Sequence, residues 1–287
     1  MKCAFVYFSG TGITPKFASE IAKGMKSRDN ATFDFLRVKK GEIFEFTNYD
    51  FIGIGAPAYS LRAPRLMTKL LRKMTFHGKP FFVFATYNTM PGNTLWDLYR
   101  VVKKSAGVCL GYLQGSITVN IRAWNPKKSS GKQLKKITEA VKDQARAFGK
   151  KLVGRYQQWL LNKDGQQQQA KWVPPKRLLL VTWAAFFTWN WQMMLTVGFK
   201  RVDKKKCTRC GLCATKICPS EAIYLTNEHL PTFVERRCVG CNGCVNLCPE
   251  DAIWTYQTRN RLPYDLYKEY ILNEEQIKIE EEPQEKG

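Results

Sequence analysis

MKCAFVYFSGTGITP (1–15) opens the chain and joins a short apolar run to a turn rich in Ser, Thr and Gly. CAFVYF (3–8) is nearly all apolar, which is typical of a parallel strand covered on both faces. SGTGIT (9–14) predicts a turn, with Thr14 as the N-cap and Pro15 as the first helical residue. This apolar run is too short for the core of a signal peptide, so we expect a buried strand.

The same alternation continues over residues 1–160. Apolar runs predict four further strands, at 32–38, 50–56, 79–86 and 116–121. Helical patterns lie between the strands, at 15–27, 64–74, 93–106 and 131–157. Strands that alternate with helices predict an α/β fold with a doubly wound, five-stranded parallel sheet. A fragment of a β/α barrel is the alternative, but it needs more strands than the chain supplies.

A duplicated cysteine string is the strongest signal in the sequence. The string CTRCGLCATKICP (207–219) recurs as CVGCNGCVNLCP (238–249). The residues that follow are also similar, with CPSEAIY (218–224) in the first copy and CPEDAIW (248–254) in the second. In bacterial two-cluster ferredoxins three cysteines of such a string bind one [4Fe–4S] cluster and the Cys-Pro cysteine binds the other. This predicts one cluster on Cys207, Cys210, Cys213 and Cys248, and a second on Cys238, Cys241, Cys244 and Cys218.

Two alternatives to iron–sulfur clusters are structural zinc and a disulfide framework. Zinc uses four ligands per site and has no use for the third cysteine of each string or for the repeated Cys-Pro. Disulfides suit secreted domains, whereas clustered thiols in a chain without a signal peptide indicate metal and a cytoplasmic location. The first string carries one extra residue, in ATKI (214–217), which we expect a bulged turn to absorb.

The N-terminal turn and two later loops form a candidate site of another kind. The hydroxyls of Ser9, Thr11 and Thr14, with the amides of a helix N-terminus, suit a phosphate group. GAPAYSLRAP (55–64) and ATYNTMPGN (85–93) follow the third and fourth strands, at the sheet edge where α/β proteins bind ligands. Tyr59 and Tyr87 have side chains that can stack on a flat heterocycle, and an ordinary loop aromatic is the alternative for each.

With these motifs the chain resembles fusions of a short-chain flavodoxin-like domain with a two-[4Fe–4S] ferredoxin. The shared features are the YFSGTG start, the loop with Pro57, Tyr59, Arg62 and Pro64, and the paired cysteine strings. The resemblance implies FMN bound by Ser9, Gly10, Thr11, Gly12, Ile13, Thr14, Pro57, Ala58, Tyr59, Thr86, Tyr87, Gly92 and Asn93. Ile13 stands where the family usually has Asn, which leaves only a backbone N–H for the phosphate there.

Four segments follow from these patterns: the flavodoxin-like domain (1–160), a linker (161–201), the ferredoxin-like domain (202–260) and an acidic tail (261–287). The linker contains 178–199, an apolar stretch without charges. At about 1.5 Å per residue a helix there reaches about 33 Å, close to the thickness of a bilayer core. A packed linker helix, a homodimer contact, a membrane-surface helix and a span are the alternatives, and a span would separate the two domains.

The chain is basic, with 46 Lys plus Arg against 24 Asp plus Glu. Residues 1–165 carry 29 basic and 10 acidic side chains, so most of the excess lies in the first domain. Such a surface indicates an acidic redox partner, for example a free ferredoxin, or anionic lipid. We expect no nucleic-acid partner, because no recognised module or aromatic platform accompanies the charge.

These features predict an electron-transfer protein that passes electrons between two [4Fe–4S] clusters and FMN and converts single-electron into paired-electron traffic. One alternative is a reductase that delivers electrons from the flavin to a small organic substrate. Another is a peripheral subunit of a membrane redox complex. The sequence shows no nicotinamide-binding fingerprint.

Overall fold

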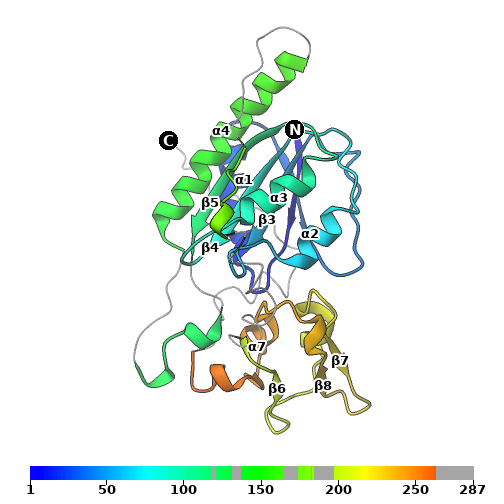
Figure 1. The fold of residues 1–287 in the computed structure, drawn as a ribbon, viewed down its shortest axis with the longest axis vertical. Helices are drawn as coiled ribbons and strands as arrows, with labels where there is room; N and C mark the ends of the chain where they lie inside the picture. The colour runs from blue at the N-terminus through cyan, green and yellow to red at the C-terminus, as the bar shows by residue number, and fades with distance from the viewer. Residues whose placement is uncertain (118–120, 131–136, 164–173, 182, 184–196, 263–287) are drawn as a thin grey trace, which may run out of the picture.

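The computed structural model describes residues 1–117, 121–130, 137–163, 174–181, 183 and 197–262. Figure 1 shows two parts, a larger α/β part and a smaller part with short strands that lies at one end of the sheet. The N-terminus lies at the opposite end of the sheet, so the carboxyl ends of the strands face the smaller part. The structure therefore places the smaller part at the edge where α/β sheets bind ligands.

Five parallel strands form the sheet of the larger part. In sheet order they are β2 (Thr32–Arg37), β1 (Lys2–Tyr7), β3 (Phe51–Pro57), β4 (Phe81–Tyr87) and β5 (Cys109–Ser116). Each neighbouring pair is parallel. The order 2-1-3-4-5 is that of flavodoxin-like folds. In these folds β2 is added on one side of β1, and β3 to β5 are added on the other side. The predicted doubly wound, five-stranded sheet is confirmed.

Among the described residues, two helices cover each face of the sheet. On one face α1 (Ile13–Lys26) and α4 (Glu139–Lys163) pack against aromatic side chains such as Phe5, Phe82 and Phe84. On the other face α2 (Arg65–Leu71) and α3 (Thr94–Val102) pack against aliphatic side chains such as Val6 and Ile54. The apolar residues of the inner strands are buried on both faces, as their continuous runs predict.

The fifth strand differs from the prediction. β5 is Cys109–Ser116, whereas the apolar pattern predicted 116–121, of which 118–120 lie outside the described residues. β5 is an edge strand whose residues alternate between buried and exposed positions in its second half. An edge strand needs no continuous apolar run, so CLGYLQGS forms a strand although SITVNI has the higher β propensity.

The smaller part is built from short elements around the cysteine strings. β6 (Arg201–Val202) pairs with β9 (Ile253–Trp254), and β7 (Ile223–Leu225) pairs with β8 (Pro231–Phe233), both antiparallel. Its helices are a π-helical turn (Cys213–Ile217) and α7 (Gly243–Leu247). Single 3₁₀ turns are Arg122–Trp124, Lys128–Ser130, Glu235–Arg237 and Tyr256–Thr258. The first two turns precede α4 in the chain, yet they pack on the smaller part, since Lys127 pairs with Arg261.

Several sequence predictions fall on residues outside the described ranges. They are the start of the helix predicted at 131–157, most of the linker and its apolar stretch 178–199, and the acidic tail beyond 262. None of the helices in the described part of the chain combines the length and apolar character needed to cross a membrane.

Helices α1 and α4 cross at two glycines. A Cβ on Gly24 would lie 2.0 Å from the Arg146 carbonyl oxygen, and a Cβ on Gly149 would lie 2.1 Å from that of Ile21. The backbones of the two helices therefore touch at this crossing. Gly154, one turn further along α4, has no atom within 4 Å of such a Cβ.

We expect Gly149→Ala to lower the free energy of unfolding by about 1–3 kcal/mol, because the new methyl group forces the two helices apart. Gly154→Ala is the matched control in the same helix. It gains helix propensity without a clash, so its stability rises by up to about 1 kcal/mol. Chemical denaturation of the two variants measures both changes. Equal effects at the two positions would refute the close crossing.

Candidate cofactor sites at the junction of the two parts

The two cysteine strings have closely similar backbones. Glu221 and Asp251, each three residues after a Cys-Pro cysteine, both have a left-handed backbone with φ of 50° and 49°. The amide of the following alanine donates to the cysteine sulfur in both halves, from Ala222 to Cys218 (3.3 Å) and from Ala252 to Cys248 (3.4 Å). The repeat in the sequence is therefore also a repeat in structure, including its N–H···S bonds.

The extra residue of the first string widens a helical turn. Cys213–Ile217 forms a π-helical turn in which the Cys218 amide donates to the Cys213 carbonyl, five residues back, at 3.1 Å. The corresponding turn of the second string, α7, is an α-helix. The expected bulged turn is confirmed, because a π-turn accommodates one more residue than an α-turn.

Electrostatic coupling shows which thiols lie together. Burial raises the pKa of Cys213 to about 12, and repulsion from the thiolates of Cys248, Cys210 and Cys207 adds to the increase. Burial likewise raises the pKa of Cys241 to about 12, with repulsion from Cys238 and Cys218. The pKa of Cys244 is raised by burial and by Cys238, Cys241 and Cys218. The structure thus brings together the same two sets of four that the strings predict.

All ten cysteines are free thiols. No three His, Cys, Asp or Glu side chains of the described residues converge closely enough to hold a single metal ion. Metal binding to either set requires the raised-pKa thiols to lose their protons, because the thiolate is the ligand. The donors present in each set, four sulfurs with amide N–H groups directed at some of them, fit an iron–sulfur cluster. Cys3 and Cys109 belong to neither set. Cys3 is buried in strand β1, whereas Cys109 lies half-buried on edge strand β5.

The turn after β1 is buried beside the second cysteine set. Ser9, Thr11 and Thr14 are each at most 2% exposed. The Gly12 amide donates to the Ser9 hydroxyl (3.0 Å), and the hydroxyls of Thr14 and Thr86 lie 3.2 Å apart. These hydroxyls, with the N-terminal amides of α1, are the donor chemistry that a phosphate group requires. The residues present therefore fit a phosphate-bearing cofactor.

The N-cap of this helix was predicted wrongly. Gly12, and not Thr14, is the N-cap of α1, and it has a left-handed backbone with φ of 85°. The chain turns at Gly12, so the helix begins at Ile13, and Thr14 and Pro15 lie inside its first turn. The Thr14 hydroxyl is directed instead to Thr86 at the end of β4.

The loops after β3 and β4 place the remaining predicted flavin contacts. Tyr59 is 8% exposed, and its ring meets Phe8 edge to face at 6.0 Å. Its hydroxyl reaches the first turn, since a Cβ on Gly10 would lie 3.0 Å from it. Pro57, Ala58 and Tyr87 are half-buried, whereas Thr86 is buried. Tyr59 is thus the aromatic residue that the structure brings to the Ser9–Thr14 turn.

Two of the predicted flavin contacts, Gly92 and Asn93, also pack the loops together. A Cβ on Gly92 would lie 2.2 Å from the Leu61 carbonyl oxygen, so the two loops touch at this glycine. The Asn93 side chain donates to the Leu178 carbonyl (3.0 Å) and accepts from the Leu178 amide (2.8 Å). Arg62 fixes the same loop through two hydrogen bonds to Asp97, of 2.5 and 2.9 Å. Asn93 therefore anchors the start of the apolar stretch to the loops.

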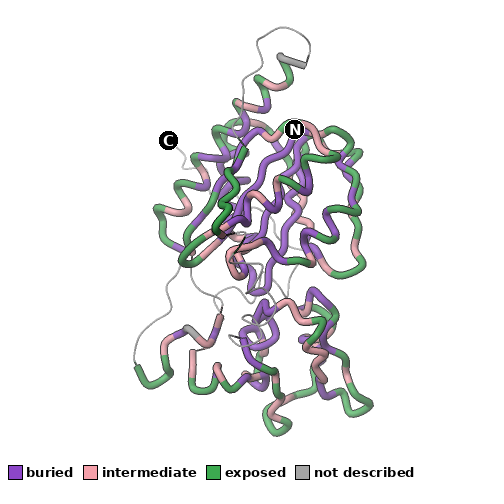
Figure 2. Tube along the Cα trace, viewed as in Figure 1, coloured by how far each residue is buried: buried purple, intermediate pink, exposed green. Residues whose placement is uncertain are grey.

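Backbone contact joins the two candidate sites. A Cβ on Gly10 would lie 2.5 Å from the Cys241 carbonyl oxygen, and one on Gly243 would lie 2.7 Å from the Gly10 carbonyl oxygen. The buried region continues without a break from the sheet to α7 (Figure 2). The turn predicted to bind phosphate and the second cysteine set thus share one buried contact.

Arg37, at the end of β2, crosses the same junction. It is 5% exposed and donates to the carbonyl oxygens of Ser9 (3.2 Å), Ile217 (2.9 Å) and Lys216 (3.1 Å). Its charge lowers the pKa of Cys241, against the larger effect of burial. The buried Arg37 guanidinium therefore donates hydrogen bonds to the Ser9–Thr14 turn and to the first string. Its positive charge also acts on the second cysteine set.

Two further ion pairs fasten the smaller part at equivalent positions of its repeat. Lys40 binds Glu221 at 2.5 Å, and its amide donates to the Pro219 carbonyl at 2.8 Å. Arg122, with a side chain that is 4% exposed, binds Asp251 and also donates to the Val245 carbonyl at 3.0 Å. Burial would raise the pKa of Asp251, but the hydrogen bonds from Arg122 and Lys128 outweigh it and hold that pKa below its usual value.

Sequence reasoning missed Arg37, Arg122 and the half-buried pair of Lys200 with Glu235. The positive charge of the first domain predicts a surface for an acidic partner or anionic lipid, and not buried contacts within the chain. One signal did exist, since an acidic residue recurs at the same position of both strings, as Glu221 and Asp251. Their basic partners lie 181 and 129 residues away in the chain, so no local pattern identifies them.

Comparison with known families agrees with the smaller part. Residues 200–254 match a family described as a 4Fe-4S dicluster domain. Solved structures similar to the chain include oxidised flavodoxin 1 from Bacillus cereus, 15% identical with a TM-score of 0.41, covering 54% of this chain and 98% of that one. A flavodoxin from the domain Archaea is also 15% identical, with a TM-score of 0.40 and coverage of 55% and 99%. A sequence comparison with curated proteins finds no match.

The chain therefore has an α/β domain with the flavodoxin-like strand order, and its residues 200–254 match a 4Fe-4S dicluster family, as the sequence predicts. The fold assignment of the first domain rests on its strand order, because the structural similarities are weak.

We expect Gly10→Ala to loosen the junction, because its Cβ would overlap the Cys241 backbone. Hydrogen exchange measured by mass spectrometry is expected to become faster in 9–14 and 238–247, with little change in the strands. Gly154→Ala again serves as the control, since its Cβ meets no other atom. Unchanged exchange in both segments would show that the two parts do not touch at Gly10.

Proposed function

We propose that this protein transfers electrons between two [4Fe–4S] clusters and one FMN. In this proposal Cys207, Cys210, Cys213 and Cys248 bind the first cluster, Cys238, Cys241, Cys244 and Cys218 bind the second, and Ser9–Thr14 bind the FMN phosphate. A flavin/iron–sulfur electron-transfer role is supported by the flavodoxin-like sheet and the dicluster domain. The observation that carries the full proposal is the contact between Gly10 and Cys241.

Each cluster supplies one electron at a time, whereas a flavin accepts one or two. The residues of the chain set the distance and the charge around these groups. Gly10 and Gly243 allow the two backbones to touch, so the phosphate-binding turn lies directly against a cluster ligand. Tyr59 closes the turn from the side of the β3 loop, and the buried Arg37 offsets negative charge on both sides of the junction.

The surroundings of the two cysteine sets differ. Lys200 lies beside Cys238 and Cys244, and its amine binds Glu235 at 2.7 Å. Burial would lower the pKa of Lys200, but Cys238, Glu235 and Cys244 outweigh it and raise that pKa, so the amine stays protonated. The π-turn joins Cys213 of the first set to Cys218 of the second, and it has no π-helical counterpart in the second string. Local charge and hydrogen bonds to sulfur set cluster potentials, so this asymmetry supports two clusters of unequal potential.

Cofactor analysis of anaerobically purified protein tests this proposal. We expect about eight irons and one FMN per chain, as two four-iron clusters and one flavin require. Cys248→Ser is expected to lose the first cluster and about half of the iron, whereas Cys109→Ser, outside both sets, retains it. Zinc in place of iron, iron near four in the unaltered protein, or a chain without flavin would contradict the assignment.

The basic surface of the first domain supports an acidic redox protein as the electron-transfer partner. We expect the rate of electron transfer from an acidic ferredoxin to fall about tenfold or more as salt rises from about 50 to about 500 mM, because salt screens the charges that steer the encounter. Stopped-flow absorbance measures this rate. Reduction by a small neutral reductant is the control and stays unchanged. A rate that is insensitive to salt would exclude electrostatic docking.

A further inference from the structure

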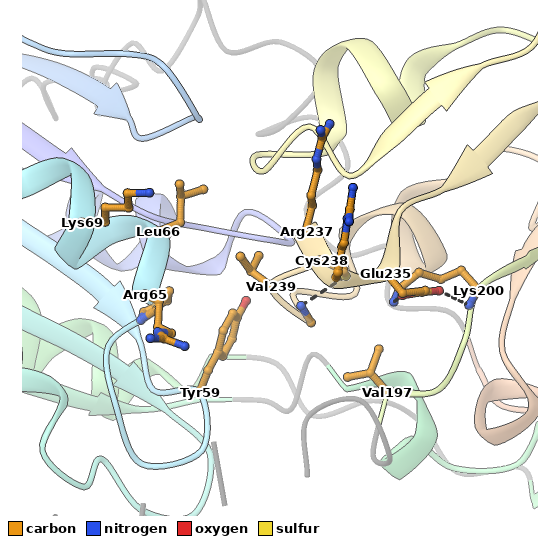
Figure 3. A pocket seen from close by; sticks show the side chains of 13 residues that line it. Tyr59, Arg65, Leu66, Lys69, Val197, Lys200, Glu235, Arg237, Cys238 and Val239 are labelled. Carbon is orange, nitrogen blue, oxygen red and sulfur yellow. Dashed lines mark hydrogen bonds and ion pairs between the residues drawn. The ribbon is translucent and has the colours of Figure 1, made fainter. Parts of the chain in front are cut away.

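A cleft of about 540 Å³ opens between the two parts of the molecule. One wall comes from the loop after β3 and from α2, with Tyr59, Arg65 and Lys69. The other wall is the 235–240 segment, with Arg237 and Cys238 (Figure 3). The volume lies within the range of about 300–1,000 Å³ that is usual for small-molecule sites.

Positive charge predominates around the cleft. Its lining includes five basic side chains and one carboxylate, that of Glu235. Glu235 is already bound by the Lys200 amine (2.7 Å) and the Lys200 amide (2.6 Å). In the part of the chain that the structure describes, Lys69, Arg236 and Arg237 form no ion pair. The cleft therefore offers cations to an anionic group from both of its walls.

The interior of the cleft is apolar and aromatic. Tyr59 and Val197 are 8% and 1% exposed, and Leu66 and Val239 are half-buried. In Figure 3 the Tyr59 ring and Val239 lie between the two charged walls. An apolar interior with cations at its edges fits an organic anion with a flat, unsaturated body, because the ring can stack while the charge is paired.

Cys238 forms part of this lining. Its sulfur accepts a hydrogen bond from the Gly240 amide at 3.4 Å, and it belongs to the second cysteine set. A molecule in the cleft therefore lies against Cys238, the proposed ligand of the second cluster, with Tyr59 on the opposite wall. Four basic residues of the lining, Arg65, Lys69, Arg236 and Arg237, are exposed to solvent.

We propose that this cleft binds a small aromatic or conjugated organic anion beside Cys238. The proposal deepens the proposed function, on which it rests, by assigning a ligand class to the edge of the second cluster. It lies next to the flavin site, with which it shares Tyr59, and differs from that site in being lined by α2 and by the 235–240 segment.

The test uses the cofactor-loaded full chain and 2-naphthoate as the probe, with isothermal titration calorimetry. We expect saturable binding of 2-naphthoate, and much weaker binding of the neutral analogue 2-naphthalenemethanol. Arg236→Gln combined with Arg237→Gln is expected to weaken binding of 2-naphthoate about tenfold or more, because two cations are lost. Lys150→Gln combined with Lys151→Gln removes the same charge from exposed positions of α4 and leaves binding unchanged.

A second measurement locates the probe. We expect 2-naphthoate to alter the electron paramagnetic resonance signal of the reduced second cluster and not that of the first. Equal affinity in both double variants would overturn the proposal. Competition between FMN and the probe would assign the cleft to the flavin and also overturn it. A changed cluster potential with unchanged probe affinity would mean that the arginines balance cluster charge, which again overturns it.

Failure of the proposed function has a separate signature. Iron and flavin are quantified in the same samples. Probe binding that depends on Arg236 and Arg237 in a chain without clusters or flavin would support the cleft and contradict the cofactor assignment. Equal affinity of the two double variants for 2-naphthoate, in a chain with about eight irons, would contradict the proposed cleft and leave the cofactor assignment intact.

Discussion

The close approach of Gly10 to Cys241 is the constraint on which the arrangement of the two domains depends. It requires a residue without a side chain at the tip of the first turn, and a second glycine, Gly243, opposite it. Because the carboxyl ends of parallel strands meet at one edge, every loop that can bind a ligand faces this contact. The iron–sulfur domain therefore packs on the ligand-binding edge of the sheet, and not on a helix or an outer strand.

Buried positive charge stabilises that approach. Arg37 and Arg122 both direct their guanidinium groups at backbone carbonyls of the second domain, and both are almost fully buried. A buried cation is costly unless it is well hydrogen-bonded, so these contacts fix the domains in one relative position more firmly than exposed lysines could. Asp251 is the counter-charge of Arg122, whereas Arg37 lies close enough to Cys241 to lower the pKa of that thiol. The interface and the redox sites therefore depend on the same electrostatic balance.

Much of the fold follows from local patterns. Continuous apolar runs predicted β1, β3 and β4, because a strand that is buried on both faces has apolar side chains at nearly every position. The cysteine spacing marked both thiol sets, since ligands of one cluster must recur at fixed intervals. The apolar pattern did not predict β5, because an edge strand tolerates exposed residues. The N-cap of α1 was predicted two residues too late, because no neighbouring residue indicates the left-handed conformation of Gly12. Arg37 and Arg122 depend on contacts between distant segments, which no local pattern contains.

The two cysteine strings also differ at the residue before the third cysteine. A duplicated domain has an approximate twofold axis, so two opposite orientations would present nearly equivalent surfaces to the sheet. Leu212 in the first string occupies the place of Gly243 in the second, and a side chain there would collide with the Gly10 carbonyl. The reversed orientation is thereby excluded by steric overlap. The unequal halves of the repeat thus remove an orientational degeneracy that a perfect duplication would have left open.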